Sequence, residues 1–427
     1  MTEPLAINGG SAILAGPFAP YRTIGEEELA GVVEVVRSGV LSRFLGCWEP
    51  DFYGGSKVLE FERAWAAHFG VRHAIAVNSA TSGLIAAIGA VGIEPGDEVI
   101  VSPYTMSASA TAIVVFNGVP VFADVDARTF NLDPADVARK ITPRTKAIMV
   151  PNIFGLPAEL DELMALAHKH KLAVIEDNAQ APGAAYRGKL AGTIGHIGVF
   201  SLNYHKHIHT GEGGMCVTND DALAERLQLI RNHAESVVED KGVKNLVNMI
   251  GFNFRMGEIE AAIGLAQLQK LQGLVAQRVA LADALRAELS GLDGLTLPHV
   301  PAHSTHVYYI YAFLLDPVVA GITRDQFIGA LTAEGVPALA GGYVRPLYLL
   351  PMYQQRIAFG SKGWPFTALQ GAAAPDYSRG ACPVCEDLHF NRLIGFEVSL
   401  HTFTAEQIKG IGAAFRKVWS RRHELKR

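Results

Sequence analysis

The sequence predicts an α/β protein in which a large, mainly parallel sheet of seven strands precedes a smaller α+β region. Two observations support this prediction. From about Arg72 to Thr218, short β-branched runs alternate with longer helical patterns, as they do in βαβ units. The runs are almost continuously apolar, which is typical of strands that helices cover on both faces.

Each apolar run in this region is expected to form one strand of the large sheet. The expected strands are His73–Val77, Glu98–Ser102, Val119–Ala123, Lys146–Val150, Leu172–Glu176, Gly198–Leu202 and Gly214–Thr218. Short amphipathic helices are expected between them. These are Ser82–Val91, Pro134–Arg139 leading to Lys140, Ala158–His170 and Asp221–Ile230.

A long helical pattern from Met256 to about Leu289 follows, and its length suits a helix that bridges two domains. After it we expect a strand, two helices and an aperiodic Gly-rich loop, at Val307–Leu315, Thr323–Glu334, Thr404–Trp419 and Gly341–Tyr377. The predicted regions are therefore an N-terminal arm (1–25), a large domain (26–275) and a small C-terminal domain (276–427).

Composition excludes several other classes of protein. The chain is 49% hydrophobic and carries a net charge of −5 without a basic stripe, so neither nucleic acid nor an anionic membrane surface is expected as a partner. The apolar stretch Ala108–Phe122 is interrupted by Asn117, Gly118 and Pro120, so no membrane span is expected. Met1–Pro20 has no basic start, so no signal peptide is expected.

Cysteine usage favours a reducing compartment. The four cysteines are too few for a disulfide scaffold, and the single Cys382-Pro-Val-Cys385 pair lacks the second ligand pair of a structural zinc site. We therefore expect free thiols, a cytoplasmic protein and no metal.

Lys206 is the first candidate for chemistry. It follows a predicted strand and precedes the Gly-rich turn Gly211-Glu-Gly-Gly214. A lysine is most often a solvated surface charge. At a buried strand end, however, an ammonium group can be desolvated and become a nucleophilic amine.

Two further groups meet the needs of Schiff-base chemistry on pyridoxal 5′-phosphate, which requires a lysine, a carboxylate against the pyridine nitrogen and a phosphate anchor. Asp177 ends an apolar strand, where α/β sheets place ligands. The strand-to-helix turn Asn78-Ser-Ala-Thr-Ser-Gly83 could bind an anion. Alone, either could be an ordinary helix cap; together with Lys206 they indicate a cofactor site.

In these motifs, taken together, the chain resembles a known family, the DegT/StrS sugar aminotransferases. The matching segments are Asn78–Gly83, Val174–Gln180, Phe200-Ser201 with Lys206, Thr210–Gly214 and Gly251–Met256. The resemblance runs from Asn8-Gly-Gly10 to Glu386. It implies the fold type I architecture of pyridoxal phosphate-dependent transferases, a homodimer with a shared active site, and pyridoxal phosphate as cofactor.

The resemblance also implies roles for particular residues. Lys206 would carry the cofactor and Asp177 would face its pyridine nitrogen. Gln180 would contact the ring or its hydroxyl. The phosphate would be held by Ala80, Thr81 and Ser201, and by Asn253 of the other subunit. An ordinary loop hydrogen bond is the alternative for Asn253.

The chain departs from the family pattern where an aromatic ring usually stacks on the cofactor. It has Tyr104 and Met106 there, and the sequence leaves open which of them contacts the cofactor. Three histidines, His205, His207 and His209, flank Lys206. A metal site is not expected in a loop with this spacing. A protonated imidazole could instead lower the pKa of Lys206 or attract an anionic substrate.

The predicted function is the transfer of an amino group from glutamate or glutamine to a keto sugar, phosphorylated or nucleotide-linked, or to a keto-cyclitol. Such products belong to amino-sugar, antibiotic or surface-polysaccharide biosynthesis. Candidate substrate contacts are His205, His207, Arg43, Tyr53 and Arg345. Arg43 and Tyr53 belong to the aromatic segment Leu41–Lys57, which could form either a loop over a sugar ring or an ordinary packed N-terminal arm. A dehydratase using His205, or a non-catalytic regulator, are the alternatives.

Overall fold

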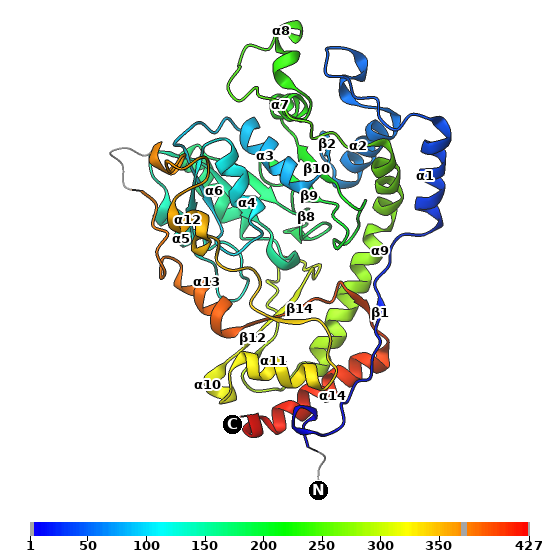
Figure 1. The fold of residues 1–427 in the computed structure, drawn as a ribbon, viewed down its shortest axis with the longest axis vertical. Helices are drawn as coiled ribbons and strands as arrows, with labels where there is room; N and C mark the ends of the chain where they lie inside the picture. Colours follow the sequence, from blue (N-terminus) through cyan, green and yellow to red (C-terminus); the bar gives the residue numbers. More distant parts are fainter. Residues whose placement is uncertain (1–3, 369–373, 426–427) are drawn as a thin grey trace.

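A seven-stranded sheet lies at the centre of the structure, a computed structural model that describes residues 4–368 and 374–425 (Figure 1). Its strand order is β2-β10-β9-β6-β5-β3-β4, and only β10 runs antiparallel to its neighbours. The strands are β2 (His73–Val77), β3 (Glu98–Val101), β4 (Val119–Phe122), β5 (Thr145–Pro151), β6 (Ala173–Asp177), β9 (Ile197–Ser201) and β10 (Gly214–Thr218). The predicted α/β fold with a mainly parallel sheet is confirmed.

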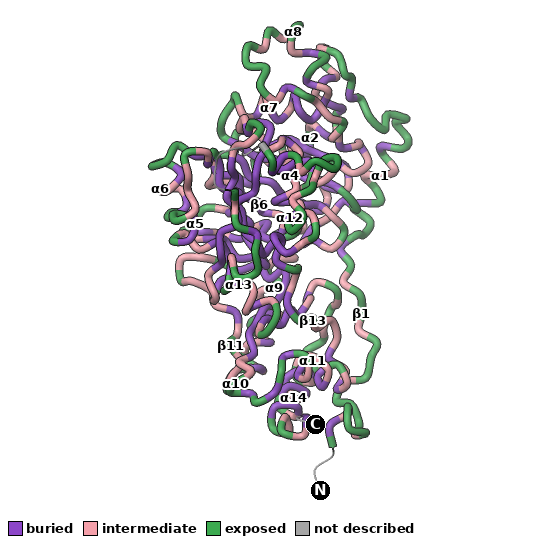
Figure 2. The backbone as a smooth tube through the Cα atoms, turned by 60° about the vertical axis from the view of Figure 1, so that its left-hand side comes forward, coloured by how far each residue is buried: buried purple, intermediate pink, exposed green. Residues whose placement is uncertain are grey.

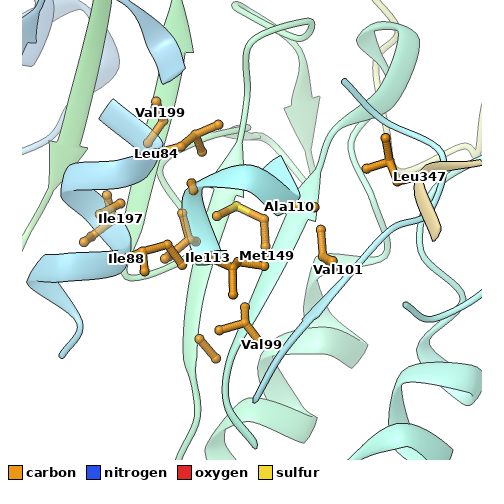
Figure 3. Packing of buried hydrophobic residues seen from close by; sticks show 14 of the residues in the cluster. Leu84, Ile88, Val99, Val101, Ala110, Ile113, Met149, Ile197, Val199 and Leu347 are labelled. Atoms are coloured by element: carbon orange, nitrogen blue, oxygen red, sulfur yellow. The ribbon is translucent and has the colours of Figure 1, made fainter. Parts of the chain in front are cut away.

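Helices cover both faces of this sheet. They are α2 (Ser56–Phe69), α3 (Ala80–Ala90), α4 (Ala108–Val115), α5 (Pro134–Lys140), α6 (Leu160–His170) and α7 (Asp221–Arg231). Figure 3 shows Leu84 and Ile88 of α3 packing with Ile113 of α4 on the face of the sheet that carries Val99 of β3. The backbone coloured by burial shows the same layering, with a buried centre and exposed outer turns (Figure 2). This packing fixes the strand ends that carry the site.

A long helix, α9 (Glu258–Leu289), leads from the large sheet to a second, smaller core. That core is built on a four-stranded antiparallel sheet of order β11-β12-β14-β13. Its strands and main helices are β11 (Leu295–Thr296), β12 (Tyr311–Leu315), β13 (Leu339–Gly341), β14 (Leu393–Phe396), α10 (Pro317–Ala320), α11 (Arg324–Ala333) and α14 (Ala405–Ser420). Within the described residues, no helix is both long and apolar enough to cross a bilayer.

The strand predicted at Val307–Leu315 begins later than expected, at Tyr311. Val307 and Tyr309 instead donate backbone hydrogen bonds to Gly155 and Phe154 of the large sheet's loops, at 2.9 and 2.8 Å. Tyr308 between them has a φ of 49°, which interrupts extended backbone. This connection brings Tyr309 to the cofactor side of the large sheet.

The N-terminal segment packs against the small core. Leu5 is buried within it, and β1 (Ala19–Pro20) pairs with β15 (His401–Thr402). Helix α1 (Glu26–Ser38) then runs against α9. The remaining elements are the hairpin β7 (Ala185–Tyr186) and β8 (Lys189–Leu190), α8 (Val238–Lys241), α12 (Pro351–Gln355), α13 (Pro383–Asp387), a π-turn (Leu388–Arg392) and short 3₁₀ turns.

The segment predicted as a loop at Gly341–Tyr377 contains helical turns, namely Leu347–Leu349, α12 and Phe366–Ala368; its residues 369–373 lie outside the described part of the chain. Tyr353 and Tyr377 pack on Phe122 of β4, with ring centroids 5.2 and 5.6 Å apart. Much of this segment, although assigned by sequence to the small domain, therefore covers the large-sheet core. The domain boundaries stay a prediction.

Candidate active site

A cavity of about 220 Å³ opens at the carboxyl ends of three adjacent strands, β5, β6 and β9. Their last residues, Pro151, Asp177 and Ser201, all contribute to its lining. This is the edge where parallel sheets bind ligands. Eight of the predicted site residues line the cavity: Ala80, Thr81, Met106, Asp177, Gln180, Ser201, His205 and Lys206.

Lys206 is buried in this cavity, with 9% of its surface exposed. It follows β9 in a turn in which its backbone N–H bonds to Asn203 O at 2.9 Å. The ammonium nitrogen lies 4.2 Å from the centroid of the Tyr309 ring. Burial lowers the pKa of Lys206 to about 8, with the positive charge of Arg278 adding to the effect and Asp177 opposing it. A neutral, nucleophilic amine is therefore accessible near neutral pH.

Asp177 is held in a fixed orientation at the end of β6. Ser109 donates a hydrogen bond from Oγ to Asp177 Oδ2 at 2.6 Å, and Ala179 N–H bonds to Oδ1 at 3.2 Å. Burial raises the pKa of Asp177, while these two hydrogen bonds and the charge of Lys206 counteract the rise. A cationic partner is what this buried carboxyl lacks, and a protonated ring nitrogen would supply one.

The turn predicted to hold a phosphate caps α3. Ser79 Oγ accepts the N–H of Ser82 at 3.0 Å, and Asn78 Oδ1 accepts the Ser82 hydroxyl at 2.6 Å. The N–H groups of the first helical residues then point out of the helix without partners inside it. Strand β10 abuts the turn so closely that a Cβ on Gly214 would lie 2.7 Å from Ala80 N.

Gln180 links the cavity to the small sheet's connections. Its Oε1 accepts the N–H of Phe154 at 2.7 Å, and its Nε2 donates to Tyr343 Oη at 2.9 Å. Both Gln180 and Tyr343 line the cavity. Because the carbonyl is engaged, the amide can only donate to Tyr343, which leaves the phenolic hydrogen available to a bound molecule.

The geometry distinguishes Tyr104 from Met106. Met106 lines the cavity. Tyr104 does not: it is fully buried behind the cavity and packs edge-on against Phe154, Tyr343 and His389. Of the pair that the sequence left open, Met106 is thus the side chain in position to contact a cofactor, and Tyr104 supports the wall behind it.

The histidines around Lys206 have different environments. His205 lines the cavity, and burial together with the Lys206 charge lowers its pKa to about 4, so the expected protonated imidazole is replaced by a neutral one. His207 does not face the cavity. It is fully buried, its Nε2 lies 2.8 Å from Val307 O, and burial lowers its pKa. Neither ring can attract an anion by charge.

Besides Tyr104 and His207, four more predicted residues lie outside the cavity lining of this chain. Arg43 is paired with Asp51 at 2.7 Å, and Tyr53 packs against Trp48 and Phe52. Arg345 is exposed. Asn253 is exposed too, and its Oδ1 accepts a bond from Arg255 Nε at 2.9 Å. Within one chain, therefore, none of the four can touch a molecule in the cavity.

Several residues of the site were not anticipated. Ser109, which holds Asp177 but does not line the cavity, was missed because it lies in the first turn of α4, inside a stretch read only for its hydrophobicity. Tyr309 and Tyr343 were missed because they lie more than a hundred residues after Lys206 in the sequence, and no local motif marks them as part of the cavity. Ser79, by contrast, carries a recognisable signal, since it is the N-cap of the phosphate turn.

A buried carboxylate beneath the site stabilises its loop. Glu176 accepts backbone N–H groups from Gly192, Ile194 and Gly195 at 2.6–2.8 Å. Asn152 donates a hydrogen bond from Nδ2 to Glu176 Oε2 at 3.1 Å, so it helps to hold this carboxylate in place.

The residues present fit pyridoxal phosphate. The cavity combines a desolvated lysine, a buried carboxyl without a cationic hydrogen-bond partner of its own, and a helix N-terminus that suits an anion. Comparisons with known proteins point the same way. Residues 23–368 match the sequence model of the DegT/DnrJ/EryC1/StrS aminotransferase family.

Individual relatives match most of the chain. GDP-perosamine synthase of Caulobacter vibrioides is 42% identical over 300 residues, which cover 70% of this chain and 79% of that protein. L-glutamine:2-deoxy-scyllo-inosose aminotransferase of Streptoalloteichus tenebrarius is 34% identical over 430 residues, covering 96% and 98%. The X-ray structure of the aminotransferase from Psychrobacter cryohalolentis superposes with a TM-score of 0.81 at 31% identity, covering 95% of this chain and 100% of that one.

Proposed function

We propose a substrate class, an amino donor and an assembly for this protein, starting from the fact that the chain belongs to the DegT/DnrJ/EryC1/StrS aminotransferase family. It is accordingly a pyridoxal phosphate-dependent aminotransferase with the fold type I architecture. The amino acceptor in the proposal is the keto group of a sugar, phosphorylated or nucleotide-linked, or of a cyclitol. The donor is glutamate or glutamine.

The names of two relatives support this choice. One is a synthase of a GDP-linked amino sugar, and the other takes its amino group from glutamine and delivers it to a keto-cyclitol. In this chain the cavity offers a neutral imidazole at His205 and a phenol at Tyr343, which suit uncharged hydroxyl groups. The observation that carries the proposal is the buried Lys206 in a cavity whose His205 and Tyr343 can hydrogen-bond to hydroxyl groups.

The predicted cofactor-binding residues of the cavity have distinct parts in the proposed reaction. Pyridoxal phosphate, when bound, supplies an aldehyde that bonds to amines and a ring that accepts electron density from the neighbouring carbon. Lys206 would bind the aldehyde carbon through Nζ at rest, and its free amine would take the proton from the donor's Cα. With its pKa lowered to about 8, Lys206 can both take and return that proton near neutral pH.

The other residues hold the reacting groups in place. Asp177, oriented by Ser109, keeps a proton on the ring nitrogen. The amides at the start of α3, with Thr81 and Ser201, bind the phosphate. Gln180 and Met106, which line the cavity, would contact the cofactor ring, and the Tyr309 ring, 4.2 Å from Lys206 Nζ, limits water near that amine.

A substrate panel tests the proposal. Purified protein loaded with cofactor is incubated with glutamate or glutamine and one ketone at a time: a nucleotide-linked keto sugar, a phosphorylated keto sugar or a keto-cyclitol. Mass spectrometry should find an amino product from one class, with 2-oxo acid formed in equal amount. Absence of any amino product from all three classes would overturn the proposed substrate class.

A dehydratase using His205 is the second candidate. Lys206 at the cavity favours transamination, because the lysine is the group that returns a proton after amino transfer. The Lys206→Ala variant separates the two, since it should lose amino transfer completely, whereas dehydration that depends on His205 should persist.

We also propose a homodimer in which Asn253 reaches the phosphate of the partner's cofactor. In one chain Asn253 lies outside the cavity and exposed, yet its backbone O is 3.2 Å from Asn78 Nδ2 beside the phosphate turn. Exposed apolar residues such as Leu246 and Ile250 precede it and suit an interface. The proposed compartment is the cytoplasm, in line with four free thiols.

Mixed dimers test the shared site. The Lys206→Ala and Asn253→Ala variants are mixed after mild unfolding and refolding. If Asn253 acts in the partner's site, each mixed dimer contains one complete site and activity returns. If Asn253 acts in its own chain, no site in the mixed dimer is complete, and the mixture stays as inactive as its components.

A further inference from the structure

A second cavity, of about 330 Å³, lies between α9 and the β1–β15 pair, away from the cofactor cavity. Figure 1 shows β1 running beside α9. The lining of the cavity includes Arg278 from α9, Tyr21 directly after β1, and His401 of β15. It shares no lining residue with the cofactor cavity.

Arg278 is the unusual member of this lining. Only 3% of its surface is exposed, and none of its three guanidinium nitrogens has a hydrogen-bond partner within the described residues. The Tyr21 ring packs against it, with its centroid 5.0 Å from Cζ, and the charge of Arg278 also acts on Lys206 and His207. A buried charge without a counterion or acceptor is strongly unfavourable, so this guanidinium calls for an anion.

The rest of the lining restricts what that anion can be. It contains no acidic side chain that could pair with Arg278, and no second lysine or arginine. Two further buried polar atoms, Tyr21 Oη and His401 Nδ1, also have no hydrogen-bond partner in the described structure. The remaining wall is mostly aliphatic and aromatic, with Leu281, Val398 and Phe403 among its members.

We propose that this cavity binds a short aliphatic carboxylate, with its carboxylate group on Arg278 and its carbon chain along Leu281 and Phe403. A planar guanidinium pairs with a planar carboxylate through two parallel hydrogen bonds. A single cation matches one negative charge, and an apolar wall suits a hydrocarbon chain better than a second charged group.

A carboxylate bound in this cavity would change the protonation of Lys206 in the cofactor site. The positive charge of Arg278 is one of the causes that lower the pKa of Lys206, after burial. A carboxylate bound to Arg278 neutralises that charge, so it would raise the pKa of Lys206 and favour its protonated form. The cavity is therefore placed to couple a carboxylate metabolite to the reactivity of the lysine.

Calorimetric titration of the holoenzyme tests the proposal, with sodium butyrate, sodium acetate and inorganic phosphate as probes in a buffer free of carboxylates. Butyrate should bind more tightly than acetate, and phosphate should not compete. Arg278→Gln should weaken butyrate binding at least tenfold, and Arg278→Lys should weaken it less. The exposed Arg416→Gln, on α14 and paired with Glu288, is the matched control and should change nothing.

A second variant separates this cavity from the cofactor site. Leu281→Trp places a larger side chain in the new cavity beside Arg278, and Leu281 does not line the cofactor cavity, so this variant should abolish butyrate binding while leaving the cofactor absorbance and basal amino transfer unchanged. Unaltered butyrate binding in both Arg278→Gln and Leu281→Trp would overturn the proposal. Equal affinity for phosphate would overturn the carboxylate assignment.

A crystal structure of the wild-type holoenzyme grown with butyrate decides the matter even if the variants fold poorly. The proposal expects planar density on the Arg278 guanidinium with a tail against Leu281. Water alone at that place, or a carbonyl or carboxylate from a second copy of the chain, would refute it. None of these outcomes depends on which ketone the enzyme aminates.

Discussion

Removal of the Ser109 hydroxyl should shift the acid limb of the pH–rate profile upward. Ser109 donates a 2.6 Å hydrogen bond to Asp177 in a fully buried setting, and this bond lowers the pKa of that carboxyl against the effect of burial. A hydrogen bond to a charged group contributes about 1.5–3 kcal/mol. Ser109→Ala should therefore raise the pKa of Asp177, and the loss of about 1.5–3 kcal/mol corresponds to a roughly 10- to 150-fold weaker preference for the ionised carboxylate.

The sign of the effect follows from the role of Asp177. The ionised carboxylate is the form that keeps a proton on the cofactor ring nitrogen. A higher pKa means that the carboxylate is lost at a higher pH, so activity should fall off at a higher pH on acidification, with the alkaline limb unchanged.

The assay is kcat/KM for amino transfer from glutamate, measured across the acid range for wild type and Ser109→Ala. Ser107→Ala is the matched control, because Ser107 lies in the same segment and its side chain makes no cap bond. A Ser109→Ala profile that superposes on wild type, or a Ser107→Ala profile that shifts equally, would refute this account of Asp177.

Two further changes test the scaffold around the site. Gly214→Ala should lower cofactor affinity at least tenfold, because its Cβ would lie 2.7 Å from Ala80 N in the phosphate turn. Fluorescence titration of the apoenzyme measures this affinity. The control variant is Gly273→Ala on α9, where an added Cβ would meet no atom within 4 Å, and it should bind the cofactor normally. Arg231→Met should lower the free energy of unfolding by about 3–5 kcal/mol in urea titration, because it leaves Glu62 buried without its 2.6 Å partner. A loss below about 1 kcal/mol would contradict the second prediction.

Much of the large sheet could be predicted because each of its strands is a local apolar run. The two ends of β2 and β10 were predicted to the residue, and Lys206 and Asp177 follow strands in a way that the sequence itself displays. The same is true of the phosphate turn, where Ser79 caps α3. These features depend on neighbours in the sequence, so the sequence is enough to find them.

Side-chain direction was not predictable in the same way. His205 and His207 are two residues apart and equally suggestive in sequence, yet the turn after β9 directs one into the cavity and the other to Val307. Tyr309 reaches Lys206 only because residues after α9 pair with the Phe154–Gly155 turn. Contacts of this kind are set by packing between distant segments, and a single sequence does not display them.

The two helices that precede β2, the first strand of the large sheet, were also missed. Neither α1 nor α2 was predicted, although α2 contributes Phe61 and Trp65 to a buried cluster under β2 and β10. The aromatic segment Leu41–Lys57 was interpreted as a loop over a substrate, and in the structure Phe52 packs into the large-sheet core. Its aromatic residues therefore have a packing role within the chain.

Covalent trapping tests the central claim, that Lys206 carries the cofactor, most directly. Sodium borohydride is added to the holoenzyme to reduce the bond between a lysine and the cofactor aldehyde, and the protein is digested and analysed by tandem mass spectrometry. The account predicts a single pyridoxyl-modified peptide, modified at Lys206, and loss of that modification when glutamate is added before the borohydride. Modification at any other lysine, with Lys206 unmodified, would contradict it.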